Sequence, residues 1–87
     1  MKLYIWGTGC GAGDLVDQGL DLSAVCAFLD SAPMSDSFLG RPVLRPEEVR
    51  NEEIDLILAA SRQVGEIAEK AAALGFDAKK LIFLKNN

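Results

Sequence analysis

The chain has 87 residues, 49% of them hydrophobic, and carries nine basic and thirteen acidic residues for a net charge of −4. This length predicts one domain over residues 1–87, with a core large enough to fold without metal or disulfide staples. The acidic balance argues against nucleic acid or an anionic membrane surface as a partner. With no histidine and only two cysteines, neither a zinc site nor a secreted disulfide scaffold is expected. No apolar stretch has the length of a membrane span, and we expect a cytoplasmic protein.

Strand and helix patterns alternate along the chain. Strands are predicted at residues 2–6, 23–30, 43–44, 54–60 and 81–84. Helices are predicted at residues 13–20, over a short segment that begins at Pro46, and from Val64 to a terminator at Gly75. Residues 31–42 are rich in Ser, Pro, Gly and Asp and predict a loop. The alternation predicts an α/β fold, a Rossmann-like three-layer domain with an open parallel sheet of about five strands in the order 3-2-1-4-5.

Some side chains have expected structural roles within these predicted strands and helices. Trp6 and Cys26 lie within predicted strands and are expected in the core. Ser61 directly follows a strand and is placed to cap the next helix. In that helix Glu66 and Lys70 are one turn apart, so a surface ion pair between them is expected.

The glycine-rich segment 7–13 lies directly after the first strand and before the first helix, where a glycine fingerprint carries weight. Gly7 permits a tight turn, Gly9 lets the backbone approach a pyrophosphate, and Ala12 takes the third, small position. Asp30 ends the second strand 23 residues after Gly7, close to the spacing of about 20 at which an acidic side chain binds a ribose hydroxyl. The candidate cofactor-binding residues are Gly7, Thr8, Gly9, Cys10, Gly11, Ala12, Asp30, Ser31, Ser61 and Arg62.

The same turn has a purely structural interpretation, because a tight connection from strand to helix needs glycines whether or not a ligand binds. Asp14 is expected in the first helical turn, with Asp17 three residues later, and carboxylates there compete for the free N–H groups and repel phosphate. No Lys or Arg lies between Lys2 and Arg41 to compensate, which leaves Arg62 as the best basic candidate.

A family resemblance rests on the segments YIWGTGCGAG, VCAFLDS, GRPVLRPEEV and IDLILAAS, followed by a closing helix before LIFL. Together they resemble the small Rossmann-like domain of bacterial surface-sugar enzymes. Similar domains are the N-terminal domain of PglD-type sugar O-acyltransferases and a module that accompanies FkbM-type methyltransferases and glycosyltransferases. The resemblance implies nucleotide-sugar binding at Gly7, Gly9 and Asp30, with Ser61 adjoining them. The acyltransferase's left-handed β-helix repeats and catalytic histidine are absent, and Asp14 replaces a basic residue often seen after the turn.

The sequence therefore predicts a module that binds a nucleotide or nucleotide-sugar, as part or accessory of a surface-sugar-modifying enzyme and without catalytic activity of its own. NAD or a nucleotide-sugar is the expected ligand, with NAD preferred over NADP because Asp30 repels a 2′-phosphate. One alternative is a fragment of an NAD-dependent dehydrogenase or epimerase, although the only tyrosine, Tyr4, is in a core strand and no Tyr-x-x-x-Lys pair exists. The other is an interaction domain with an empty turn. The apolar region around Phe76 and Phe83 leaves open a homodimer or contact with a neighbouring domain.

Overall fold

The computed structural model describes residues 2–8, 10–61 and 63–83. Its strands are β1 (Leu3–Trp6), β2 (Val25–Leu29), β3 (Ser37–Phe38), β4 (Arg41–Leu44), β5 (Leu56–Ala59) and β6 (Leu81–Phe83). Its α-helices are α1 (Cys10–Asp17) and α2 (Val64–Ala73), and short 3₁₀ turns cover Leu22–Ala24, Pro46–Glu48, Asn51–Glu53 and Ala78–Lys80. None of the helices in these ranges combines the length and the hydropathy that crossing a membrane requires.

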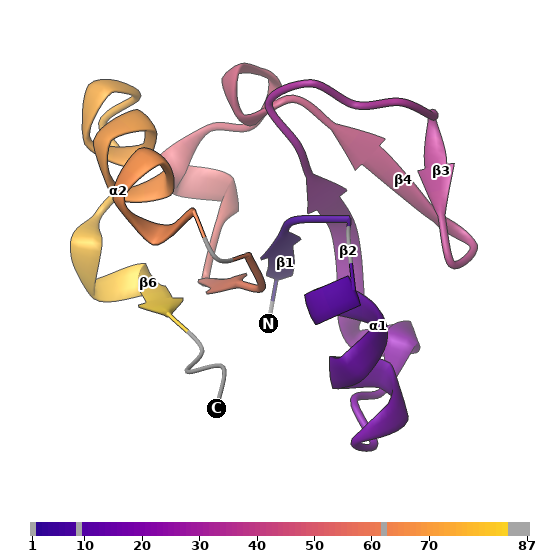
Figure 1. The fold of residues 1–87 in the computed structure, drawn as a ribbon. Helices are drawn as coiled ribbons and strands as arrows, with labels where there is room; N and C mark the ends of the chain where they lie inside the picture. The colour runs from indigo at the N-terminus through magenta and orange to yellow at the C-terminus, as the bar shows by residue number, and fades with distance from the viewer. Residues whose placement is uncertain (1, 9, 62, 84–87) are drawn as a thin grey trace.

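The strands form one six-stranded sheet in the order β3-β4-β2-β1-β5-β6 (Figure 1). The pairs β4-β2, β2-β1, β1-β5 and β5-β6 are parallel, and β3 pairs antiparallel with β4. The chain is therefore a mixed α/β fold with a mostly parallel sheet, as expected from the alternating pattern.

The sheet differs from the expected five-strand order by a sixth, antiparallel strand at its edge. This strand, β3, falls within residues 31–42, which the composition predicted to be a loop. The hairpin turns through Leu39 at φ 52° and Gly40 at φ 79°. Two successive residues with positive φ match the right-handed twist of a tight hairpin. Leucine is an unusual residue for such a turn, so the pattern gave no hairpin signal.

Both faces of the sheet are covered, because α1 and α2 lie on opposite sides of it (Figure 1). Under α2, Tyr4 and Trp6 are 7% and 4% exposed and belong to a core cluster that includes Ile67 of the helix. Under α1, Ile5 and other apolar side chains of the sheet pack with Leu15 of the helix. The expectation that Trp6 lies in the core is confirmed, and each such burial contributes about 1.5–3 kcal/mol.

Cys26 is exposed, so the expectation that it lies in the core is wrong. The cause is an irregularity in the pairing of β1 with β2. Leu3 is opposite Val25 while Tyr4 is opposite Ala27, which leaves Cys26 as the extra residue of a bulge. A bulge removes one residue from the alternation of inward and outward side chains.

The first helix begins at Cys10 and ends at Asp17, three residues earlier than the predicted 13–20 at each end. The tight connection from β1 is therefore completed before Cys10, and Gly11 and Gly13 are helical.

The second strand, β2, starts at Val25, later than the expected residue 23. The Asp21 carboxylate accepts the backbone N–H and the hydroxyl of Ser23, which starts a 3₁₀ turn ahead of β2.

The second helix ends where the sequence predicted. Gly75 has φ 79°, and the N–H of Phe76 donates to the Ala71 carbonyl across the helix end, as in a glycine-terminated helix.

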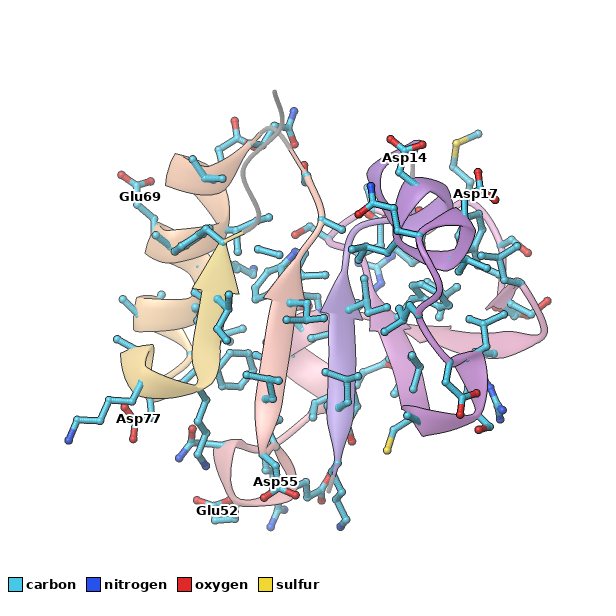
Figure 2. All side chains as sticks on the ribbon, turned by 90° about the horizontal axis from the view of Figure 1, so that it is seen from below. Asp14, Asp17, Glu52, Asp55, Glu69 and Asp77 are labelled. Carbon is cyan, nitrogen blue, oxygen red and sulfur yellow. The ribbon has the colours of Figure 1, made fainter. Side chains whose placement is uncertain are left out.

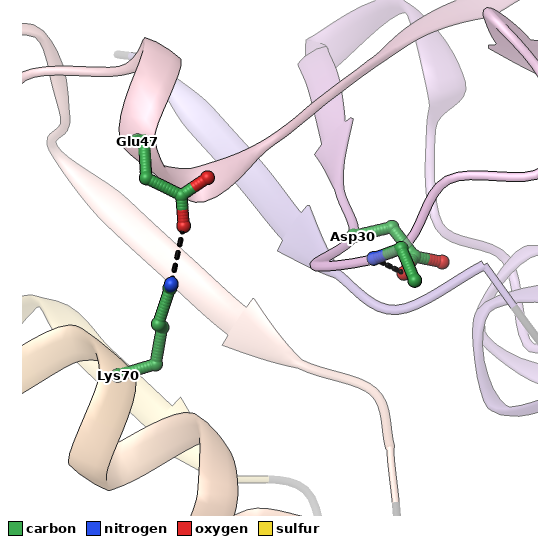
Figure 3. A network of polar contacts seen from close by, with 4 residues as sticks. Asp30, Glu47 and Lys70 are labelled. Atoms are coloured by element: carbon green, nitrogen blue, oxygen red, sulfur yellow. Dashed lines mark hydrogen bonds and ion pairs between the residues drawn. The ribbon is translucent and has the colours of Figure 1, made fainter.

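The expected ion pair between Glu66 and Lys70 is wrong. Lys70 instead forms an ion pair with Glu47, which lies in the 3₁₀ turn after β4 (Figure 3). A tertiary contact has replaced the local one.

Candidate functional site

Three strands end at the same level of the sheet. Trp6, the last residue of β1, is paired with Leu29 at the end of β2 and with Ala59 at the end of β5. Because these strands are parallel, the residues that follow them begin at one common edge. The chain runs from β1 outward to β2 and β4 and then returns to β5 on the other side of β1. Open α/β sheets bind their ligands beyond such a reversal of strand order.

Backbone hydrogen bonds fix this edge. The N–H of Gly7 donates to the Leu29 carbonyl at 2.8 Å, and the N–H of Ala60 donates to the Trp6 carbonyl at 2.9 Å. The N–H of Asp30 likewise donates to a carbonyl of β4 at 3.0 Å. The start of the glycine turn is therefore held against both neighbours of β1.

Gly7 has a requirement for glycine that involves no ligand. Its φ is +125°, and a Cβ added there would lie 3.0 Å from the Ala60 carbonyl oxygen and 3.6 Å from the Ser61 Cβ. Both the backbone conformation and the limited space therefore strongly disfavour other residues. The same contact brings Ser61, at the end of β5, directly beside the turn.

Thr8 and Asp30 are joined side chain to side chain. The Thr8 hydroxyl donates to Asp30 Oδ2 at 2.7 Å. The backbone N–H of Ala32 donates to Asp30 Oδ1 at 2.9 Å (Figure 3). Asp30 is half-buried. A carboxylate offers about four lone-pair positions, so two remain for a further donor.

Ser61 is near the second helix but does not cap it. The N-cap residue of α2 is Gln63, which makes no side-chain capping bond. Ser61 Oγ accepts the N–H of Gln63 at 3.2 Å, one step before the helix. The predicted cap is therefore wrong by two residues, and the Ser61 side chain stays near the glycine turn.

The first turn of α1 contains no acidic residue. Asp14 is in the second turn, so the expectation that it competes for the free N–H groups at the helix start is wrong. Those N–H groups belong to the residues from Cys10 onward. Figure 2 shows Asp14 and Asp17 near the end of the sheet to which the strands point, whereas Glu52 and Asp55 lie at the opposite end. The two helix carboxylates still add negative potential at this edge.

The structure thus places part of the predicted set together, namely Gly7, Thr8, Asp30 and Ser61. Ser31 is exposed and follows Asp30 at the same edge. Gly9 and Arg62 lie outside the described residues, as do the side chains of Cys10 and Ala12; Gly11 contributes backbone to α1.

Two arginines lie at opposite ends of β4, Arg41 as its first residue and Arg45 directly after it. Arg41 is far from this edge, since its Nε donates to the Leu22 carbonyl, just ahead of β2, at 3.0 Å. Arg45, which is not among the predicted site residues, directly follows β4, whose last carbonyl accepts the N–H of Asp30. The signal that could have identified it is its position one residue after a predicted strand. Among the described residues, no three His, Cys, Asp or Glu side chains are grouped closely enough to hold a metal ion.

A scan against protein-family models and a search of curated proteins gave no match to this chain.

Proposed function

We propose that the chain is a Rossmann-like nucleotide-binding module whose ligand lies beyond the ends of β1, β2 and β5. One observation carries the proposal: the turn after β1 and the acidic residue after β2 are in direct contact through the 2.7 Å Thr8–Asp30 hydrogen bond. Ser61 adjoins them from β5. Residues distant in sequence converge at the position where this class of sheet binds nucleotides.

Each part of the edge has a chemical role in this proposal. The free N–H groups at the start of α1 receive phosphate oxygens, and the absence of acidic residues in the first turn favours this. The Asp30 carboxylate accepts a ribose hydroxyl. The ligand is NAD or a nucleotide-sugar, and the resemblance to domains of surface-sugar enzymes supports the second. The module supplies binding, and catalysis belongs to another part or partner of such an enzyme.

A thermal-shift panel of NAD, NADP, ADP, UDP and UDP-glucose tests the proposal. A ligand at 100 times its Kd stabilises the folded state by about 2.7 kcal/mol, which for a domain of this size is a rise in Tm of more than about 10 °C. Asp30→Asn should abolish most of this rise. Glu52→Gln, an exposed acid at the opposite end of the sheet (Figure 2), is the matched control and should keep it.

One observation favours the competing function, an interaction domain with an empty turn. The contact with Ala60 is enough to explain why residue 7 is glycine, without any ligand. The same panel separates the two functions. A wild-type Tm that none of the five ligands moves at millimolar concentration would overturn the nucleotide proposal and leave the interaction domain.

A further inference from the structure

We propose that Thr8 is a positioning residue that sets the specificity of this site by orienting the Asp30 carboxylate toward a ribose 2′-hydroxyl. The inference rests on the proposed function and assigns Thr8 a role through its side chain. A glycine fingerprint uses this position only for its backbone.

The geometry fixes both oxygens of the carboxylate. Oδ2 accepts from the Thr8 hydroxyl and Oδ1 accepts from the Ala32 N–H, so the side chain is held from the glycine turn on one side and from its own loop on the other. Neither donor is charged, and no described Lys or Arg forms an ion pair with Asp30. The carboxylate is therefore oriented without being neutralised.

The pair also has a defined hydrogen-bonding character. Thr8 gives its only hydroxyl hydrogen to Asp30, so both side chains offer only acceptor lone pairs to a ligand. Such a surface binds hydroxyl or N–H donors and disfavours phosphate oxygens. If Thr8 loses its hydroxyl, the Oδ1 bond to Ala32 alone is left, and ligand binding must then immobilise the carboxylate.

The immobilisation cost of one side chain corresponds to about a three- to tenfold change in Kd. The test uses calorimetry on the whole chain with two matched probe pairs, ADP with 2′-deoxy-ADP and UDP with 2′-deoxy-UDP. Thr8→Val keeps the shape and removes the donor, while Thr8→Ser keeps the donor.

For whichever ribonucleotide binds, we expect Thr8→Val to raise Kd about three- to tenfold, and Thr8→Ser to restore it. The matching 2′-deoxynucleotide should bind wild type and Thr8→Val within about twofold of each other, because it lacks the hydroxyl that Asp30 accepts. Equal weakening of both members of a pair would show that Thr8 merely maintains the turn, and no weakening would show that it has no role. Either result overturns this inference and leaves the proposed function intact. Wild type that binds none of the four probes overturns this inference, whereas the proposed function is overturned only if NAD, NADP and UDP-glucose also leave the Tm unchanged.

Discussion

Replacement of Gly7 by alanine is the sharpest test of how the turn is built. The new Cβ would meet the Ala60 carbonyl oxygen at 3.0 Å and its carbon at 3.3 Å, in a residue whose φ of +125° is one that residues with side chains rarely adopt. Ala60 cannot easily move away, because its N–H is bonded to Trp6 of β1. The clash is therefore with fixed backbone.

The cost has two parts. Backbone strain at such a φ is about 1–3 kcal/mol, and overpacking against neighbours that cannot yield adds about 1–3 kcal/mol, for a sum of about 2–6 kcal/mol. A chain of 87 residues has a free energy of unfolding of about 4–13 kcal/mol. Gly7→Ala should therefore remove a large share of the total stability.

Urea unfolding at 25 °C measures this effect. Gly13→Ala is the matched control, since it lies in α1 with nothing within 4 Å of its added Cβ. It should stabilise the chain by about 0.5–1 kcal/mol through better helix propensity. A Gly7→Ala variant within about 0.5 kcal/mol of wild type, the range of an ordinary surface substitution, would refute the close packing of the turn against β5.

Three further predictions follow from single residues. Gly75→Ala places a side chain at φ 79° with no steric contact, so it should cost about 1 kcal/mol, seen as a fall in Tm of about 4–8 °C. Lys70, and more weakly Arg45, holds the pKa of Glu47 below its ordinary value of 4.5, so the pair stabilises the fold above pH 4.5 and this contribution is lost as the pH falls through the lowered pKa. The stability difference between wild type and Lys70→Gln should accordingly vanish in acid, and a difference that persists there would contradict the ion pair. Cys26 is exposed, so in a Cys10→Ser variant a thiol reagent such as Ellman's should titrate one thiol per native chain, and a thiol that reacts only in urea would show the bulge to be wrong.

The parts of the fold that sequence patterns predicted are those in which local and tertiary preferences agree. The apolar segments that form β1 and β5 lie in the centre of the sheet. Their sequences contain no helix or turn pattern that would predict another structure. Gly75 was identifiable because the end of a helix needs a residue tolerant of positive φ.

The misassigned features depend on partners that a sequence pattern does not specify. Cys26 lies in an apolar run, and only the shifted pairing with β1 turns it outward. Lys70 had a suitable acid one turn away, yet it pairs with Glu47, more than twenty residues earlier, because folding brings that acid closer. The start of α1 was placed too late because glycines disfavour helices, and a short connection after Gly7 overrides that preference.

The candidate site also has features that the sequence predicted and features that depend on the tertiary structure. Spacing placed Gly7 and Asp30 at the ends of two strands, and the expected strand order made these strands neighbours, but neither specified that their ends are level. The parallel pairing of β1 with β2 supplies that information and brings the Thr8 hydroxyl onto the Asp30 carboxylate. The sequence also gave no reason to consider the side chain of Thr8, because the fingerprint describes backbone geometry.

The central claim is that a nucleotide binds at the edge formed by the ends of β1, β2 and β5, and an amide-resolved NMR titration of the ¹⁵N-labelled chain tests it most directly. NAD or UDP-glucose is added to about 1 mM, the concentration that half-saturates a site with a binding free energy of about −4.1 kcal/mol. We expect saturable shifts for the amides of Thr8, Asp30 and Ser61. The amides of Glu52 and Asp55, at the opposite end of the sheet (Figure 2), should stay in place. Spectra that neither ligand changes, or shifts confined to residues away from this edge, would contradict it.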